Sequence, residues 1–469
     1  MNRIILLALL ISTFSVAAQP TITWTDPISV SSEEYGDKKN SIALNSAGEP
    51  MVLHGASNGA PGLYLSIMSG GEFGEPIQIT PETSIYLSEA EGPIMAVDGE
   101  KIAVSYQING DWETGSRVVM SADGGLTWGD PYVLNPEASD YTLVESISFD
   151  SYGFPFVGLK WGMKHTLQGI QLYDEATDSF LPPVDGGWAL DGEVVCECCP
   201  ARTSAHNGIY YNLIRNNNSN TRDIWLAVSQ DGTNWSDALD IDPTNWYINS
   251  CPATGASSTF MDDGTMIATY MSGANGSRIF WSQINLETLE LMDAQQLDPE
   301  SSSTENRPSV TSNGEWVITA WERSSSGYDI MVALSDAGPQ AMANSIVDVT
   351  DNLEILSGHN RNPSVVFDGE FVHLTFRNTS EGVVKYMRGT ISGTSKIESI
   401  ESLQWNLLTL SESWVVNGIE GGVTFVVYDL NGRILEQGDA YNEVIISKRS
   451  GVSLLQVTKD QQVKTFKLF

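Results

Sequence analysis

Four cysteines, the only ones in the chain, lie within one stretch of the sequence. Cys196, Cys198 and Cys199 form a Cys-x-Cys-Cys motif, and Cys251 follows at the start of the next similar segment. In an oxidising compartment such cysteines pair as disulfides, but this motif is cramped for two ordinary bridges. Four thiolates can instead hold zinc or copper, with tetrahedral sulfurs about 2.3 Å from zinc. Either interpretation ties two segments of the chain together.

Arginine is scarce in this chain, which has 24 basic residues against 59 acidic ones. Several arginines nevertheless stand at comparable places, where strand-length apolar runs begin or end. A guanidinium binds a carboxylate or a sulfate through two parallel hydrogen bonds, so a ring of arginines suits an anionic sugar. The alternative is that each arginine pairs with an acidic neighbour, as in Arg222-Asp223 and Glu322-Arg323. The candidate substrate-binding residues are Arg202, Arg215, Arg307, Arg323, Arg361 and Arg377.

An internal repeat supplies the elements that would position these side chains. From residue 39 onward a segment of about fifty residues recurs, with strand-length runs rich in Val, Tyr and Trp and no long helical periodicity. The units begin near residues 41, 92, 145, 199, 251, 307 and 361. They predict an all-β fold, a seven-bladed β-propeller, with six blades and one inserted segment as the alternative. First strands begin and second strands end at one face of such a fold, which would gather the arginines there.

The N-terminal region predicts how the ring closes. The segment from Thr23 to Val30 resembles the end of a repeat, from Thr127 to Leu134, and the seventh unit lacks a clear fourth strand of this kind. An N-terminal strand that completes the last blade would remove the open edge of a linear array.

A turn motif indicates the type of propeller. The segment from Ser121 to Trp128 is a full Asp-box, the one from Ser229 to Trp235 a shortened version, and Ser335 to Gly338 a remnant. With the repeats, this resembles the Asp-box (BNR) sialidase-like superfamily over residues 20–395, and within it an uncharacterised Cys-x-Cys-Cys subgroup. The motif is structural and says little about function. Sialidases use an arginine triad for the substrate carboxylate, but the Arg-Ile-Pro expected in the first blade is replaced here by Lys38 to Ser41.

Seven-bladed polysaccharide lyases, such as the ulvan lyases, are the nearer architectural resemblance. Those enzymes neutralise a uronate with Arg or His and abstract its C5 proton with Tyr or His. The resemblance implies Tyr211, Tyr270 and His165 as catalytic candidates, with Arg215 and Arg222 beside them. A lectin-like or scaffold propeller needs none of these roles and remains the alternative.

The two ends of the chain differ in sequence pattern from the repeats. Residues 1–18 combine a short positive start, an apolar run and a small-residue cleavage site, which predicts a signal peptide. Residues 403–469 resemble the C-terminal sorting domain of proteins exported by the type IX secretion system, predicting a small β-sandwich. A carbohydrate-binding sandwich is the alternative. We therefore expect a secreted or cell-surface attached protein whose partners include the type IX machinery.

The net charge of −35 limits the partners further. It disfavours non-specific binding to nucleic acid or anionic membranes, and no later apolar stretch is long enough to span a bilayer. The leading hypothesis is a carbohydrate-active protein that acts on an acidic polysaccharide or oligosaccharide, as a polysaccharide lyase or a sialidase-like glycosidase. The alternative is a non-catalytic propeller that binds glycan or protein. No cofactor is required unless the cysteines hold zinc or copper.

Overall fold

The computed structural model describes residues 19–137, 141–162, 167–186, 195–236, 238–350, 359–393, 406–409, 413–419, 421–429, 432–448, 451–459 and 462–468. These residues belong to two compact units, one covering residues 19–393 and the other lying beyond residue 393. The regular elements of the described residues are all β-strands, apart from short 3-10 helices such as η1 (Glu33–Tyr35) and η4 (Pro339–Asn344). The all-β prediction is confirmed. None of the described helices is long and apolar enough to cross a membrane.

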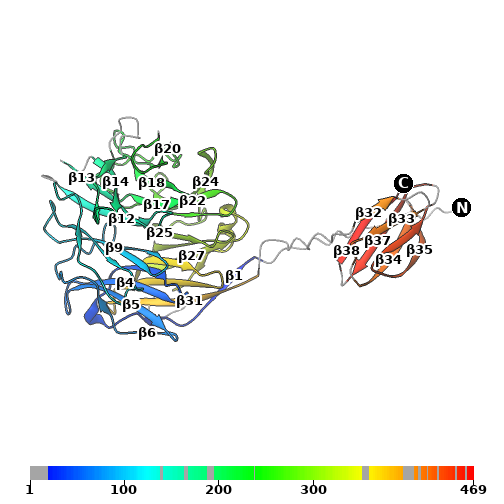
Figure 1. The fold of residues 1–469 in the computed structure, drawn as a ribbon, viewed down its shortest axis with the longest axis horizontal. Coiled ribbons are helices and arrows are strands. Elements are labelled where there is room, and N and C mark those ends of the chain that lie inside the picture. Colours follow the sequence, from blue (N-terminus) through cyan, green and yellow to red (C-terminus); the bar gives the residue numbers. More distant parts are fainter. Residues whose placement is uncertain are drawn as a thin grey trace. The chain divides into compact units, whose positions relative to one another are not determined.

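The described part of residues 19–393 forms seven antiparallel sheets (Figure 1). The first sheet holds β3 (Lys38–Leu44), β4 (Pro50–Ala56), β5 (Gly62–Ser69), β6 (Glu72–Phe73) and β7 (Ile77–Gln78). The second holds β8 (Ile94–Asp98), β9 (Lys101–Gln107), β10 (Ser116–Ser121) and β11 (Tyr132–Val133). The third holds β12 (Thr142–Phe149), β13 (Pro155–Trp161), β14 (Leu167–Asp174), β15 (Ser179–Phe180) and β16 (Val184–Asp185).

The remaining four sheets follow the same order along the chain. The fourth holds β17 (Arg202–His206), β18 (Ile209–Arg215), β19 (Ile224–Ser229) and β20 (Leu239–Asp240). The fifth holds β21 (Ser257–Phe260), β22 (Thr265–Ser272), β23 (Arg278–Asn285) and β24 (Glu290–Gln296). The sixth holds β25 (Thr304–Ser312), β26 (Val317–Ser324), β27 (Tyr328–Ser335) and β28 (Val347–Asp348). The seventh joins β29 (Asn360–Phe367), β30 (Phe371–Asn378) and β31 (Val383–Ser392) to β1 (Thr21–Trp24) and β2 (Ile28–Ser29).

The first strands of the sheets lie beside one another in sequence order. Contacts run from β3 to β8, β12, β17, β21, β25 and β29, and β29 returns to β3. This arrangement is a propeller, and each predicted unit start lies in or shortly before one of these strands. The predicted closure is confirmed, because β1 pairs antiparallel with β31, with Thr21 opposite Ser392.

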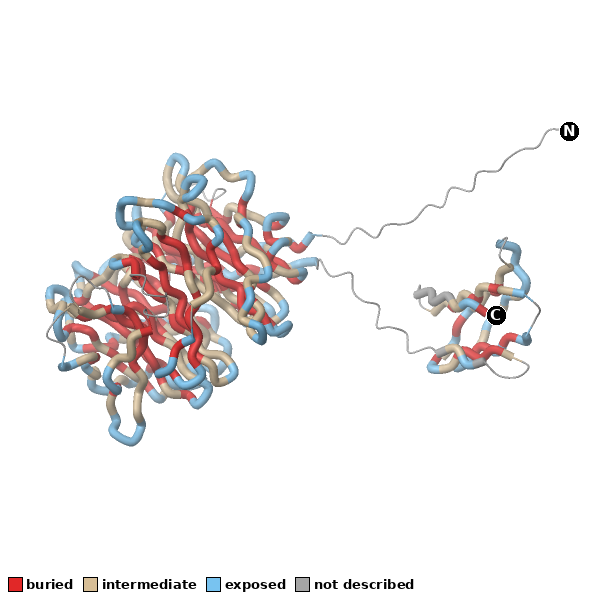
Figure 2. Tube along the Cα trace, turned by 90° about the horizontal axis from the view of Figure 1, so that it is seen from above, coloured by how far each residue is buried: buried red, intermediate tan, exposed pale blue. Residues whose placement is uncertain are grey.

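Packing between the sheets buries both faces of most of them. Figure 2 shows the strands of this unit mainly buried, with the exposed residues in the connecting loops. Each large apolar cluster draws on two neighbouring sheets; one joins Leu213 and Leu226 of the fourth sheet to Met266 and Ala268 of the fifth. At about 25 cal/mol per Å² of apolar surface, this inter-sheet burial is the main stabilising contribution to the fold.

The predicted Asp-box turn between β10 and β11 has its own hydrogen-bond pattern. Asp123 accepts hydrogen bonds from the Ser121 hydroxyl at 2.8 Å and the Thr127 amide at 2.9 Å, while the Trp128 indole donates to the Gly125 carbonyl at 3.1 Å. Bonds from Thr127 and Ser121 lower the pKa of Asp123 to about 2. The aspartate is thus used inside its own turn, which fits a structural role.

The second unit contains two sheets. One holds β32 (Asn406–Thr409), β33 (Ser413–Asn417) and β36 (Val444–Ser447), and the other holds β34 (Gly422–Asp429), β35 (Ile434–Tyr441), β37 (Ser453–Lys459) and β38 (Gln462–Leu468). Side chains of both sheets, including Trp414, Val444, Val427 and Leu455, share one core. This is the packing of a small β-sandwich. The predicted signal peptide at residues 1–18 lies outside the described residues.

Candidate functional site

A cavity of about 170 Å³ lies where the first strands begin. Six of the seven sheets, or the loops that lead into them, contribute to its wall. Its volume is below the roughly 300 Å³ of ordinary small-ligand pockets, so it is too small for a whole oligosaccharide. The lining residues are Lys39, Asn40, Ser41, Glu89, Ala90, Ile94, Arg202, Ala253, Thr254, Gly255, Ala256, Ser257, Arg307, Pro308, Ser309, Asn362, Pro363 and Ser364.

Strained backbone recurs at equivalent positions of this wall. Lys39, Ala253, Arg307 and Asn362 have φ values of 50°, 48°, 54° and 56°, in the left-handed region that residues other than glycine seldom adopt. For Lys39, Arg307 and Asn362 the strand register also shifts at this point, as in a β-bulge. Bulges redirect a side chain out of the regular alternation, and strain of this kind concentrates at functional sites. The repeat thus turns matched residues toward the cavity.

The charged lining of the cavity is mainly cationic. Lys39, Arg202 and Arg307 face one carboxylate, Glu89. Burial, followed by the charges of Arg202 and Arg307, holds the pKa of Lys39 well below its usual value. Like charges brought together in a partly buried space favour an anion between them.

Three arginines from two neighbouring sheets converge on Glu89. Arg307 Nη2 lies 2.8 Å and Arg361 Nη2 3.4 Å from Glu89 Oε2, and Arg377 Nη1 contacts Glu89 Oε1. Burial by itself raises the pKa of Glu89, but the charges of the three arginines outweigh it and hold the pKa below the ordinary value. Glu322 accepts a second contact from Arg307 at 3.1 Å and from Arg361 at 3.3 Å.

These contacts match, in part, the alternative prediction that each arginine pairs with an acidic neighbour. Asp37 completes the network through Arg377. Even so, among the described residues the buried N–H groups of Arg307 Nη1 and Arg361 Nε have no hydrogen-bond acceptor. Buried donors are nearly always satisfied, so these two are open to an acceptor such as a water molecule or a ligand group.

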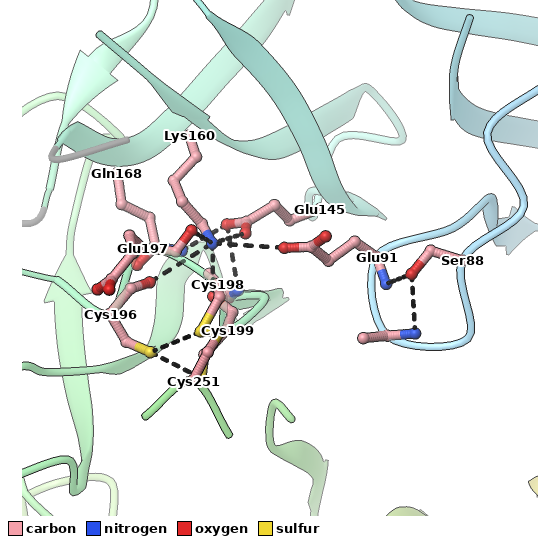
Figure 3. A network of polar contacts seen from close by, with 12 residues as sticks. Ser88, Glu91, Glu145, Lys160, Gln168, Cys196, Glu197, Cys198, Cys199 and Cys251 are labelled. Atoms are coloured by element: carbon pink, nitrogen blue, oxygen red, sulfur yellow. Dashed lines mark hydrogen bonds and ion pairs between the residues drawn. A yellow bond between two sulfur atoms is a disulfide. The ribbon is translucent and has the colours of Figure 1, made fainter. Parts of the chain in front are cut away.

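A second charged cluster lies beside the cavity, around the fully buried Lys160 of β13. Its Nζ is 2.6 Å from Glu145 Oε1 and 3.8 Å from Glu91 Oε1 (Figure 3). Burial lowers the pKa of Lys160, but Glu145 and Glu91 outweigh it and raise the pKa above the usual value. Burial raises the pKa of Glu91 to about 7 against the opposing charge of Lys160. Glu91 can therefore give or take a proton near neutral pH.

An aromatic cluster adjoins Glu91. Trp112 lies between Tyr86, at 5.0 Å edge-to-face, and Tyr141, stacked at 5.6 Å. Burial and the charge of Glu91 raise the pKa of Tyr141, which places its ring near this carboxylate. All three rings are half-buried, so part of their aromatic surface faces outward.

Glu89, Glu91 and Glu145 were not among the site residues predicted from the sequence. Glu89 and Glu91 stand in the Ser88 to Gly92 segment, an acidic pair just before a predicted first strand, and that placement was the available signal. Glu145 stood at a predicted unit start but carried no chemical assignment.

The predicted catalytic tyrosines do not line the cavity. Tyr211 and Tyr270 are buried in the apolar cluster between the fourth and fifth sheets. The Tyr270 hydroxyl donates to the Ile241 carbonyl at 3.1 Å and contacts the Ser282 hydroxyl at 3.0 Å. Neither hydroxyl is placed to reach a substrate in the cavity. His165 lies outside the described residues.

Of the predicted substrate-binding arginines, Arg202 and Arg307 line the cavity, Arg361 and Arg377 contact its lining residue Glu89, and Arg215 and Arg323 do neither. Arg215 is buried and donates to the backbone carbonyls of Arg222 at 2.7 Å and Met271 at 2.8 Å. Arg323 pairs with Asp348 at 3.0 Å. The structure therefore brings Arg307, Arg361 and Arg377 together at Glu89 and places Arg202 in the same cavity wall as Arg307.

The cysteine motif forms a turn next to Lys160, whose Nζ donates to the Cys199 carbonyl at 2.8 Å. Cys198 and Cys251 form a disulfide, while Cys196 and Cys199 are free and buried. A hydrogen bond from Cys199, with the nearby Arg222 charge, lowers the pKa of Cys196 to about 6. The sulfurs of Cys196, Cys198 and Cys199 lie within 4.8 Å of one another.

The four-thiolate zinc or copper hypothesis stays a prediction, because it would need the Cys198–Cys251 bridge to be reduced. The disulfide takes up two of the four sulfurs, which leaves two thiols where a closed zinc site needs four ligands.

Comparisons with known proteins give distant likenesses only. No family model matches the chain, and no curated protein matches it. Among solved structures, an α-L-arabinanase of Penicillium chrysogenum is 10% identical with a TM-score of 0.44, covering 78% of this chain and 98% of its own. A Trypanosoma rangeli sialidase is 12% identical with a TM-score of 0.45, covering 92% and 84%. A protein of unknown function from Dyadobacter fermentans is 12% identical with a TM-score of 0.46, covering 67% and 97%. Similarity at this level says nothing about the reaction of this chain, and the Asp-box superfamily stays a prediction.

Proposed function

We propose that the propeller binds an acidic glycan at the cavity and acts on it there as a polysaccharide lyase or a glycosidase. The observation that carries the proposal is the charged lining, in which the guanidiniums of Arg202 and Arg307 face one carboxylate, in a chain with a net charge of −35. Such a local reversal of sign concentrates anionic ligands at the opening.

Glu89 supports the choice of a carboxylate as the ligand group. It occupies the place where the guanidiniums of Arg307, Arg361 and Arg377 converge. A uronate or sialate carboxylate offers the same two oxygens and would use the free N–H groups of Arg307 and Arg361. The substrate carboxylate thus enters beside Glu89 or displaces it.

Glu91 is the proposed acid–base residue. In a lyase Glu91 takes the proton next to the sugar carboxylate, while the arginines stabilise the negative charge that develops on that carboxylate. The electron pair of the broken C–H bond then forms the C=C bond, the glycosidic C–O bond breaks, and the leaving oxygen takes a proton from water. In a glycosidase the protonated form gives its proton to the glycosidic oxygen as the C–O bond breaks, and water bonds to the anomeric carbon. The ammonium group of Lys160, paired with Glu145, lies beside Glu91 in either case. The half-buried Trp112 cluster gives the sugar an apolar surface to rest on.

The test is to incubate the purified protein with uronate-containing and with sialylated glycans. A lyase gives an unsaturated product and a glycosidase releases a reducing sugar. Glu91→Gln should lower kcat at least tenfold with little change in binding. Arg307→Ala should weaken binding at least tenfold. No product from either class of glycan would refute the catalytic proposal.

Glu89→Gln is the matched variant for the binding step. It removes the internal carboxylate but keeps the side-chain size, so it should strengthen binding of the acidic glycan. Weaker binding would mean that Glu89 belongs to the binding site itself rather than standing in for the ligand.

A non-catalytic binding propeller is the second candidate. The observation that favours it is the extent of internal pairing, because Glu322 and Asp37 already contact the same arginines as Glu89. It predicts saturable glycan binding that Glu91→Gln leaves unchanged, with no product formed.

We further propose that the propeller has seven blades and that residues 1–18 and 403–469 direct export. The closed succession of first strands supports the count, and the sandwich of the second unit supports a separate C-terminal module. A chain lacking residues 403–469 should stay inside the cells of a producing strain that exports the full chain through a type IX system. Equal export of both chains would refute the sorting role.

A further inference from the structure

The cysteine turn brings a disulfide into contact with two thiols. Cys196 Sγ lies 2.8 Å from Cys199 Sγ and 3.7 Å from Cys198 Sγ, and Cys198 is bonded to Cys251. Cys196 and Cys199 are buried, whereas Cys251 is exposed. One end of the sulfur cluster is thus enclosed and the other reaches solvent.

The surroundings hold the sulfurs in place and favour a charged sulfur at Cys196. Arg222 Nη1 donates to Cys196 Sγ at 2.9 Å. Lys160 Nζ donates to the carbonyls of Cys199 at 2.8 Å and Glu197 at 3.3 Å, which fixes the backbone of the turn (Figure 3). A guanidinium against a thiol stabilises the thiolate, the form that attacks disulfides.

We propose that this cluster is a thiol–disulfide exchange site, in which the bridge moves between Cys198–Cys251 and Cys196–Cys199. The Cys196 thiolate attacks Sγ of Cys198, the bond to Cys251 breaks, and Cys251 leaves as a thiolate. Cys199 then attacks Sγ of Cys196, which breaks the Cys196–Cys198 bond and frees Cys198. One disulfide and two thiols are present throughout, so no external oxidant is consumed. The protons lost by Cys196 and Cys199 are taken up, through solvent, by Cys198 and Cys251.

The exchange has two consequences. The Cys198–Cys251 bridge joins the segments that lead into β17 and β21, and these segments supply Arg202 and residues 253–257 to the cavity wall. Moving the bridge removes that tether. It also presents Cys251 as an exposed thiol that can react with the disulfides of small thiol compounds.

The experiment is alkylation of the untreated full chain with N-ethylmaleimide, without reductant, followed by peptide mapping over time. We expect Cys251 to be labelled in the wild type at least tenfold faster than in Cys196→Ser, where the attacking sulfur is gone. Cys199→Ser is the matched control, because it keeps the first step and should still label Cys251. The wild-type time course alone also tests the proposal should a variant fail to fold, because chains labelled at both Cys198 and Cys251 must accumulate.

Three outcomes would overturn the proposal. The first is labelling of Cys251 at the same rate in the wild type and in Cys196→Ser. The second is a chain with two bridges and no reactive thiol. The third is a chain that holds about one thiophilic metal ion by elemental analysis and reacts only after chelation.

Discussion

Replacing Glu91 by glutamine should stabilise the propeller in a pH-dependent way. Burial raises the pKa of Glu91 from the ordinary 4.5 to about 7, so the folded protein resists ionising this side chain. At 1.36 kcal/mol per pH unit, the difference corresponds to about 3 kcal/mol. The cost is absent below pH 4.5, grows as the pH rises, and is complete above about pH 7. Glutamine carries no charge and does not incur it.

The expected result is therefore a variant as stable as the wild type at pH 4 and up to about 3 kcal/mol more stable at pH 8. This figure already includes the 3.8 Å contact with Lys160, because the charge of Lys160 opposes the rise in the pKa of Glu91. Urea unfolding followed by tryptophan fluorescence at several pH values measures the gain. A variant less stable than the wild type at pH 8, or a gain that is equal at pH 4 and pH 8, would refute the reasoning.

Three further substitutions follow from the same contacts. Glu89→Gln should destabilise the propeller rather than stabilise it, because the arginines hold the pKa of Glu89 below its ordinary value. Urea unfolding should show a loss of stability at pH 7 that disappears as the pH falls below that depressed pKa. Lys160→Met should cost about 3–5 kcal/mol at pH 7 by leaving Glu145 buried without a counter-charge, and a loss that the added change Glu145→Gln does not relieve would contradict this. Tyr270→Phe should cost about 1 kcal/mol and leave glycan turnover unchanged; loss of turnover in a folded variant would restore the tyrosine as a catalytic candidate.

The fold could be predicted from the sequence because its information is repeated. Each repeat has the same order of turns and strand-length runs, and the segment from Thr23 to Val30 resembles the repeat end that the seventh repeat lacks. The pairing of β1 with β31 needed no knowledge of side-chain packing. The arginines at the starts of first strands were predictable for the same reason, since equivalent positions of a repeat meet around one axis.

The remainder of the site depends on features that the sequence pattern does not encode. Both faces of a sheet are buried against its neighbours, so the alternation along a strand does not tell which residues reach the cavity. Tyr211 and Tyr270 therefore looked equivalent to cavity residues although they pack between sheets. The position of Glu89 depends on how the loop before β8 folds over three arginines from distant parts of the chain. That contact spans 218 to 288 residues along the sequence.

The pairing of β1 with β31 also sets the order in which the chain can fold. Thr21 and Ser392 are 371 residues apart, so the propeller ring cannot close until nearly all of residues 19–393 have been synthesised. Pairings of such high contact order form slowly, and the edges of β31 and β1 stay available to other chains until then. In a chain that crosses a membrane before it folds, these strand edges stay unpaired until the chain reaches the other side. Joining β1 directly after β31 by circular permutation would make the closing pair local and shorten that interval.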